Sequence, residues 1–224
     1  MATTARQLLI DETMVFAAKA MARHGVLKIA LIGSLVTDKA NPKDTDLVVT
    51  ISDDIDLKDF ARLSRRLQGR SQGFNRWADI FLVDESGEYL GRTCPWKECR
   101  GGIRASCQAL HCGWRPHLYD DLQNLKLEEK TIKYPEIELW PNLIVRVRIP
   151  DDIKIALEQF QREYLPNKRI RYVYPKNANT NQFVSDRWSN PAAEDLFKQK
   201  WGGKTKIKNL HKAGNTCQKC SHFQ

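Results

Sequence analysis

The stretch IALIGSLVTDKANPKDTDLVVTI, residues 29–51, decides the fold of this chain of 224 residues. It holds two apolar, β-branched runs, separated by a polar loop that begins at Gly33-Ser34. Such runs, bounded by turn residues, predict two buried strands over 26–32 and 44–51. A third strand is predicted over WADIFLV, residues 77–83, after an amphipathic helix that starts near Leu57 and ends at 70–73.

The rest of the pattern extends this core into an α/β (α+β) protein with a small mixed sheet and helices on one face. Further helices are predicted over 4–24, 119–127, 151–164 with Asp151 as N-cap, and 191–201, and a further strand over 143–149. Residues 91–117 and 167–190 read as irregular. We therefore divide the chain into a core over 1–90, a Cys-rich insert over 91–118, a segment over 119–165 that completes the core, and a basic extension over 166–224.

The composition is that of a folded globular protein, with 42% hydrophobic and 28% charged residues. The net charge is +9, and residues 151–224 carry +7 of it, which favours a polyanionic partner or serves only solubility. No apolar run approaches the length of a membrane span, and Asp11 and Glu12 interrupt the place of a signal-peptide core. We therefore expect a cytoplasmic protein that does not contact membranes and whose six cysteines do not form disulfides.

Three aspartates form the most informative cluster. Asp44 and Asp46 lie two residues apart at the start of one predicted strand, so their side chains share a face. If the strand that holds Asp79 lies beside it, the three carboxylates repel one another strongly unless Mg²⁺ or Mn²⁺ binds them. Alternatively, Asp44 and Asp46 are ordinary turn residues and Asp79 is an isolated strand acid, although an unpaired charge in a buried strand is costly.

Gly33-Ser34 at a strand end suits a phosphate group, because glycine allows close backbone approach and the hydroxyl of serine donates. Together, residues 29–51 and 77–83 resemble the nucleotidyltransferase fold of the DNA polymerase β superfamily, in the small bacterial branch that includes antitoxin-type minimal nucleotidyltransferases. The resemblance covers about residues 26–84. It implies that Gly33 and Ser34 bind a triphosphate, that Asp44 and Asp46 are ligands of both metal ions, and that Asp79 is the third ligand and the acceptor base.

Two departures from that family concern nucleotide binding. Leu35-Val36-Thr37 stands where the minimal enzymes usually carry Ala-Arg-Gly, and Lys43 stands where many members have Ser. Lys43 or Lys39 is then expected to contact phosphate in place of the missing Arg. The resemblance implies transfer of a nucleoside monophosphate from a nucleoside triphosphate, expected to be ATP, to a hydroxyl of RNA such as tRNA, of a protein or of a small molecule.

Four cysteines gather within the insert, at Cys94, Cys99, Cys107 and Cys112. Four thiolates, or three with His111, suit a structural Zn²⁺ site, whereas the alternative is a set of free thiols. The tail holds His211, Cys217, Cys220 and His222. These residues form a second zinc site, contribute to the first, or lie in a terminal segment that binds no metal.

The segment HCGWRPHLYDDL, residues 111–122, more weakly resembles uncharacterised bacterial nucleotidyltransferase-domain proteins with a similar insert. Arg115, His117 and Asp120-Asp121 either approach the active site or lie in solvent, with Asp120 capping a helix. Tyr172, Tyr174 and Trp188 lie among cations and either stack on a polynucleotide or pack within the extension. Two other functions stay open: a non-catalytic zinc-containing nucleic-acid-binding module, and an antitoxin that binds or modifies a partner toxin.

Overall fold

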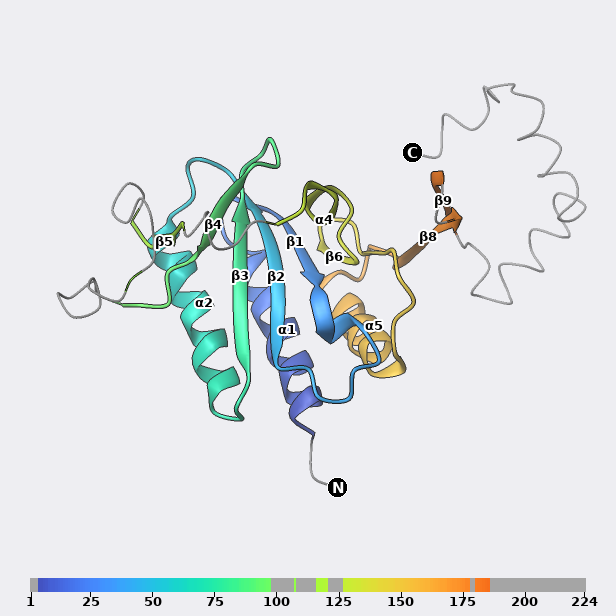
Figure 1. The fold of residues 1–224 in the computed structure, drawn as a ribbon, viewed down its shortest axis with the longest axis horizontal. Helices are drawn as coiled ribbons and strands as arrows, with labels where there is room; N and C mark the ends of the chain where they lie inside the picture. The colour runs from blue at the N-terminus through green and yellow to red at the C-terminus, as the bar shows by residue number, and fades with distance from the viewer. Residues whose placement is uncertain (1–3, 98–106, 108–115, 121–126, 178–179, 186–224) are drawn as a thin grey trace, which may run out of the picture. The chain divides into compact units, whose positions relative to one another are not determined.

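The computed structural model describes residues 4–97, 107, 116–120, 127–177 and 180–185 (Figure 1). The helices are α1 (Ala5–Ala20), α2 (Leu57–Gln72), α4 (Glu129–Lys133) and α5 (Asp151–Tyr164), with a 3-10 turn η1 (Gly33–Val36). The strands are β1 (Val26–Ile32), β2 (Asp44–Ile51), β3 (Trp77–Val83), β4 (Tyr89–Thr93), β5 (Leu118–Tyr119), β6 (Ile137–Trp140), β7 (Ile144–Val145), β8 (Arg171–Asn177) and β9 (Thr180–Ser185).

The strands of the described residues form one mixed sheet in the order β5-β4-β3-β2-β1-β6-β7-β8-β9. β1 runs antiparallel to β2, and β2 runs parallel to β3, with Asp46 paired to Ile32 on one side and to Asp79 on the other. The bounds predicted for these three strands are confirmed. The strands that hold the three aspartates are therefore neighbours in the middle of the sheet.

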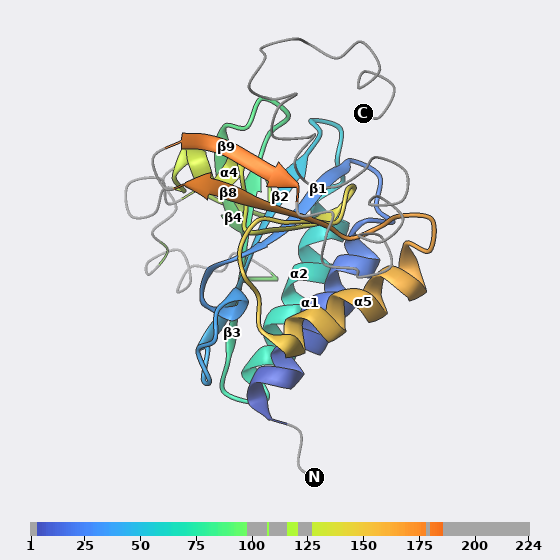
Figure 2. The ribbon, with the colours of Figure 1, turned by 90° about the vertical axis from the view of Figure 1, so that its right-hand side faces the viewer.

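Helices α1, α2 and α5 cover one face of the sheet (Figure 2). Their apolar sides pack on the inward-facing residues of β1, β2 and β3, such as Leu31, Leu47 and Ile80, all of which are fully buried. The periodicity of α2 is a strong sequence signal because its leucines and its arginines occupy opposite sides. Asp56 caps this helix by accepting hydrogen bonds from the amides of Lys58 and Asp59.

The opposite face carries a smaller apolar cluster and the short helix α4. Ile132 of α4 packs with Ala30, Val48 and Phe81, and the ammonium group of Lys28 donates to the carbonyl of Ile132 at 3.0 Å. The prediction of helices on one face is therefore right for the three long helices and wrong for α4. The side chains of the three aspartates, near the start of β2 and β3, lie on this second face. Side chains alternate along a strand, and Leu47 and Ile80, which follow Asp46 and Asp79, face the long helices.

Several predicted elements need correction. Residues 91–117 are not wholly irregular, because 91–93 belong to β4. The helix predicted over 119–127 is wrong at Tyr119, which lies in β5 and pairs with Arg92 of β4. Residues 167–190 contain β8 and β9. The first helix ends at Ala20, β7 is much shorter than the predicted 143–149, and α4 and β6 were not predicted.

The start of α5 differs in detail from its prediction. Pro150 occupies the N-cap position, and Asp151 and Asp152 lie in the first turn. Asp152 accepts a 2.6 Å hydrogen bond from the guanidinium of Arg6, which ties α5 to α1. The helix predicted over 191–201 lies outside the described residues.

The described residues up to Val184 belong to one compact unit. Among the described residues, no helix is long and apolar enough to cross a membrane.

Candidate functional site

The turn after β1 brings the backbone against a carboxylate. Gly33 has a φ of +80°, and a Cβ at this position would overlap the carboxylate of Asp46. Only glycine combines this left-handed conformation with so close an approach. The next residue, Ser34, donates a long 3.4 Å hydrogen bond to Asp44. Gly33 and Ser34 therefore border the two aspartates of β2, as their place in the sequence led us to expect.

A threonine between the two aspartates fixes the direction of both. Thr45 is fully buried toward the helices, where its hydroxyl lies 3.1 Å from that of Thr13, which donates to the carbonyl of Leu9. Because side chains alternate along a strand, burying Thr45 turns Asp44 and Asp46 to the opposite face. Both aspartates are partly buried there.

Asp79 lies directly beside Asp46 across β2 and β3 and is held by an arginine. Nη1 of Arg92, on β4, donates to Oδ1 of Asp79 at 3.0 Å. The guanidinium of Arg92 also lies over the ring of Tyr119, with 5.2 Å between Cζ and the ring centroid. The sequence prediction missed Arg92 because it treated residues from 91 onward as irregular.

A fourth carboxylate at this end of the sheet was not predicted. Glu136 immediately precedes β6. The first residue of β6, Ile137, pairs with Leu31 of β1, and the residue after Leu31, Ile32, pairs with Asp46. Only one strand, β1, thus lies between Glu136 and Asp46. Oε2 of Glu136 is buried and has no hydrogen-bond partner among the described residues. The alternation in IELW, with Ile137 and Leu139 buried, is the sequence signal that would have found this strand.

The electrostatics of the site centre on Asp46. Burial, together with the nearby carboxylates of Asp44, Asp79 and Glu136, raises the pKa of Asp46 from 3.8 to about 7. Burial is the largest cause, and the three like charges follow. At neutral pH, the site therefore holds more negative charge than its surroundings stabilise.

This charge and the all-oxygen donor set fit Mg²⁺ or Mn²⁺, for which carboxylate oxygens are the usual protein ligands. Within the described part of the chain, however, no three His, Cys, Asp or Glu side chains are gathered closely enough to hold a metal ion already. The ion pair to Arg92 accounts for this in part, because it directs Asp79 toward β4. For all three aspartates to bind a cation, the carboxylate of Asp79 must contact the cation together with Arg92 or in place of Arg92.

The predicted zinc ligands are only partly described. Cys94 follows β4, and its amide donates to the carbonyl of His117 at 2.8 Å, while Cys107 is partly buried. Cys99 and Cys112 lie outside the described residues, as do His111, His211, Cys217, Cys220 and His222. The zinc sites stay predictions.

His117 lies beside α2 and not among the aspartates. Its pKa is lowered first by burial and then by Arg65 and Lys58 of α2, and Asp56 opposes this shift. Asp120 is buried next to β5, and Arg115 and Asp121 lie outside the described residues. One of the two alternatives drawn from the sequence had His117 approach the active site. The structure instead places His117 beside α2.

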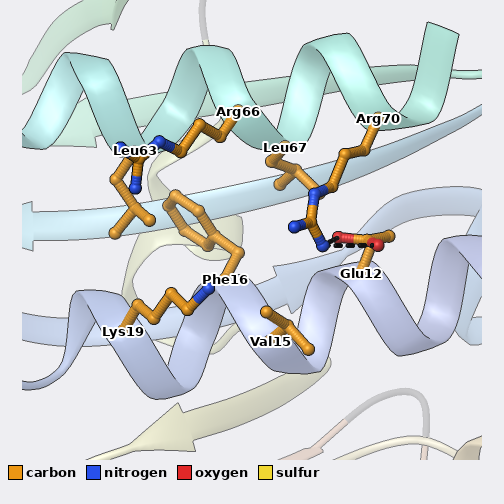
Figure 3. A pocket seen from close by; sticks show the side chains of 8 residues that line it. All are labelled: Glu12, Val15, Phe16, Lys19, Leu63, Arg66, Leu67 and Arg70. Carbon is orange, nitrogen blue, oxygen red and sulfur yellow. Dashed lines mark hydrogen bonds and ion pairs between the residues drawn. The ribbon is translucent and has the colours of Figure 1, made fainter. Parts of the chain in front are cut away.

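A shallow groove lies elsewhere, between α1 and α2 (Figure 3). Phe16 and Leu67 form its floor, and Arg70 reaches across it to Glu12 with bonds of 2.9 and 3.0 Å. These helices cover the face of the sheet opposite the aspartates, so the groove is not part of the carboxylate site.

Comparison with known proteins adds one match. A family of unknown function, DUF6932, matches residues 1–99, which include α1, β1 to β4 and all three aspartates. No curated protein and no solved structure matches the chain. The matched segment is thus similar to a family whose function is not described, and it ends within the Cys-rich insert.

Proposed function

We propose that the protein is a nucleotidyltransferase that uses Mg²⁺ or Mn²⁺ to move a nucleoside monophosphate from a nucleoside triphosphate to a hydroxyl group. The observation that carries this proposal is the position of Asp46, crowded by three other carboxylates and pressed against the Gly33 turn. A cluster of acids whose only ion pair is that between Asp79 and Arg92 among the described residues, beside a turn that only glycine can form, suits a metal-bound triphosphate.

Each residue has a proposed role. Asp44, Asp46 and Asp79 would hold the divalent cations. When bound, such ions lower the pKa of the acceptor hydroxyl and neutralise the phosphates. The hydroxyl of Ser34 and the ammonium group of Lys43 contact phosphate oxygens, and Gly33 lets the backbone approach them.

The proposed reaction is a direct displacement. The oxygen of the acceptor hydroxyl forms a bond to the α-phosphorus, the bond from this phosphorus to the bridging oxygen breaks, and pyrophosphate leaves. The proton of the hydroxyl passes to a carboxylate oxygen of Asp79. Arg92 is a positioning residue in this scheme, because its ion pair sets the direction of the Asp79 carboxylate.

The test is transfer of label from each of the four α-labelled nucleoside triphosphates to total cellular RNA and protein, with Mg²⁺ or Mn²⁺. We expect label with the wild-type protein and none with Asp46→Asn. Asp11→Asn, an exposed acid on α1, is the matched control and should transfer label normally. Full activity of Asp46→Asn would refute the assignment.

A second candidate is a non-catalytic nucleic-acid-binding module. The ion pair between Asp79 and Arg92 favours it, because this pair stabilises the charge of Asp79 without a metal. A module of this kind would bind nucleic acid but show neither label transfer nor stabilisation by Mg²⁺.

A further inference from the structure

The loop between β1 and β2 carries the two side chains proposed to contact phosphate, Ser34 at its start and Lys43 at its end. Leu35 and Val36 anchor the first turn of this loop in the core, since both are buried. Residues 37–40, in contrast, are exposed. Because an exposed segment has no apolar packing to order it, polar contacts must hold it in one conformation.

Thr37 ties the middle of the loop back to its start. Its hydroxyl donates to the carbonyl of Ser34 at 2.8 Å, and its amide donates to the same carbonyl at 3.2 Å. The hydroxyl oxygen of Thr37 also accepts a hydrogen bond from the amide of Lys39 at 3.3 Å. A single hydroxyl group therefore links Ser34 to the part of the loop that carries Lys39.

A guanidinium group from α1 holds the same loop from the inside. Nη1 of Arg6 donates to the carbonyl of Lys39 at 2.9 Å, and Nη2 donates to the carbonyl of Leu35 at 3.1 Å. Nε of Arg6 donates to Asp152 of α5 at 2.6 Å, and this carboxylate balances its charge. Among the described residues, Arg6 is the only side chain of another helix or strand that hydrogen-bonds to residues 35–42.

The burial of Arg6 shows how it acts. Its side chain is only 9% exposed, and its donors are directed to two carbonyls and a carboxylate. Arg6 is therefore placed to fix the loop and not to contact a bound phosphate. Asp152, its acidic partner, lies beyond the residues 1–99 that the family model matches, so the later part of the chain also contributes to this arrangement.

We propose that Thr37 and Arg6 are positioning residues, which hold the loop from Gly33 to Lys43 in the conformation that binds the triphosphate of the donor nucleotide. This inference rests on the proposed nucleotidyltransferase function and adds to it the residues that set the affinity for the triphosphate. Without their contacts, the loop would be ordered only when the triphosphate binds, and the cost of this ordering would weaken binding.

The two residues should act on the triphosphate and not on the cations. Asp44, Asp46 and Asp79 lie on β2 and β3, whose positions are set by strand pairing. Loosening the loop leaves these strands in place. A variant that loosens it should therefore lose affinity for a triphosphate while its affinity for a divalent cation stays the same.

The test uses inorganic tripolyphosphate as the probe, because it carries no base and needs no acceptor. Its binding in excess Mg²⁺ is measured by isothermal titration calorimetry, and binding of Mn²⁺ alone by electron paramagnetic resonance. Thr37→Val keeps the size of the side chain and removes the hydroxyl, so it should weaken tripolyphosphate binding between about 2-fold and about 10-fold, the range for one neutral hydrogen bond. Thr37→Ser keeps the hydroxyl and should bind as the wild type does.

Arg6→Lys is the second variant. Lysine keeps the charge opposite Asp152 but cannot donate to both carbonyls at once, so it should weaken tripolyphosphate binding by about tenfold or more. Arg23→Lys is the matched control, because Arg23 is also paired with an acid, Asp59, but makes no contact with the loop. Thr37 is exposed, so Thr37→Val should unfold at the same urea concentration as the wild type even if Arg6→Lys does not.

The outcomes separate this inference from the proposed function. Equal tripolyphosphate binding by Thr37→Val and Thr37→Ser, or a parallel loss of Mn²⁺ binding in Thr37→Val, would show that the hydroxyl does not position the loop. Either result leaves the transferase standing if label is transferred. If tripolyphosphate binding depends on Thr37 and Arg6 but no nucleotide transfers label, the positioning role stands and the transferase does not. A wild-type protein that binds no tripolyphosphate would overturn the inference whatever the label shows.

Discussion

Replacing Asp46 by Asn should stabilise the metal-free protein, by an amount that grows between about pH 4 and pH 7. In the unfolded chain, this carboxyl ionises near its ordinary pKa of 3.8, whereas in the folded protein it ionises near 7. The folded state therefore binds the proton more tightly, and ionisation between these values disfavours folding. Asn resembles the protonated acid, so the two proteins should be equally stable below about pH 4, differ increasingly from pH 4 to pH 7, and differ by a constant amount above pH 7.

The size of the effect follows from the pKa. A shift from 3.8 to about 7 corresponds to about 4 kcal/mol at 1.36 kcal/mol per unit. Because the carboxyl stays partly exposed to solvent, we halve this figure to about 2 kcal/mol. Asp46→Asn should thus gain about 2 kcal/mol in the free energy of unfolding at pH 8, only a part of this at pH 5, and close to nothing below about pH 4.

Urea unfolding in EDTA at pH 5, 6, 7 and 8 measures this difference for the wild type, Asp46→Asn and the control Asp11→Asn. The difference between Asp46→Asn and the wild type should grow from pH 5 to pH 7 and then level off, and Asp11→Asn is the control for the loss of one acid at a site outside the cluster. A difference that does not change with pH would show that the carboxylates do not repel Asp46 as the structure indicates, and would remove the main support for a metal site.

Three further predictions concern the turn, the arginine and the Cys-rich insert. Gly33→Ala should lower the free energy of unfolding by about 1–3 kcal/mol, because alanine is strained at the φ of +80° found there. Gly69→Ala, whose new methyl group meets nothing within 4 Å on α2, should raise it by about 0.5–1 kcal/mol. Equal urea midpoints for the two would contradict the strain assigned to position 33. Arg92→Met should tighten Mn²⁺ binding on the order of tenfold by removing a nearby positive charge, as measured by the electron paramagnetic resonance of free Mn²⁺. Arg66→Met on α2 should leave the binding unchanged. Unchanged binding in Arg92→Met would count against Asp79 as a ligand. Cys107→Ser should lose zinc measured by mass spectrometry of the purified protein, and an unchanged zinc content would exclude Cys107 as a ligand.

The central strands were predictable because their signals are local. β1, β2 and β3 each combine a β-branched apolar run with turn residues at the ends, and alternation places Asp44 and Asp46 on one face without knowledge of the neighbours. That β3 lies next to β2 was a condition of the metal hypothesis, and the parallel pairing meets it.

The missed parts depend on contacts far along the chain. β4 contains Gly91 and Arg92 and is stabilised by pairing, so its composition does not indicate a strand. β6 has only four residues and pairs with β1, more than one hundred positions earlier. Because Arg92 lies in β4 and Glu136 lies directly before β6, their approach to the aspartates depends on strand pairings that local patterns do not show.

The direction of Thr45 has a consequence for folding as well as for chemistry. If β2 slipped by one residue against its neighbours, Asp44 and Asp46 would enter the apolar layer beneath α1 and α2, where two unpaired carboxylates cannot be solvated. The acids that we propose to bind cations therefore also exclude the wrong register of the strand. Selection for the reaction and selection against misfolding act on the same two side chains, so a variant that abandons the reaction would still gain from keeping a polar side chain at these positions.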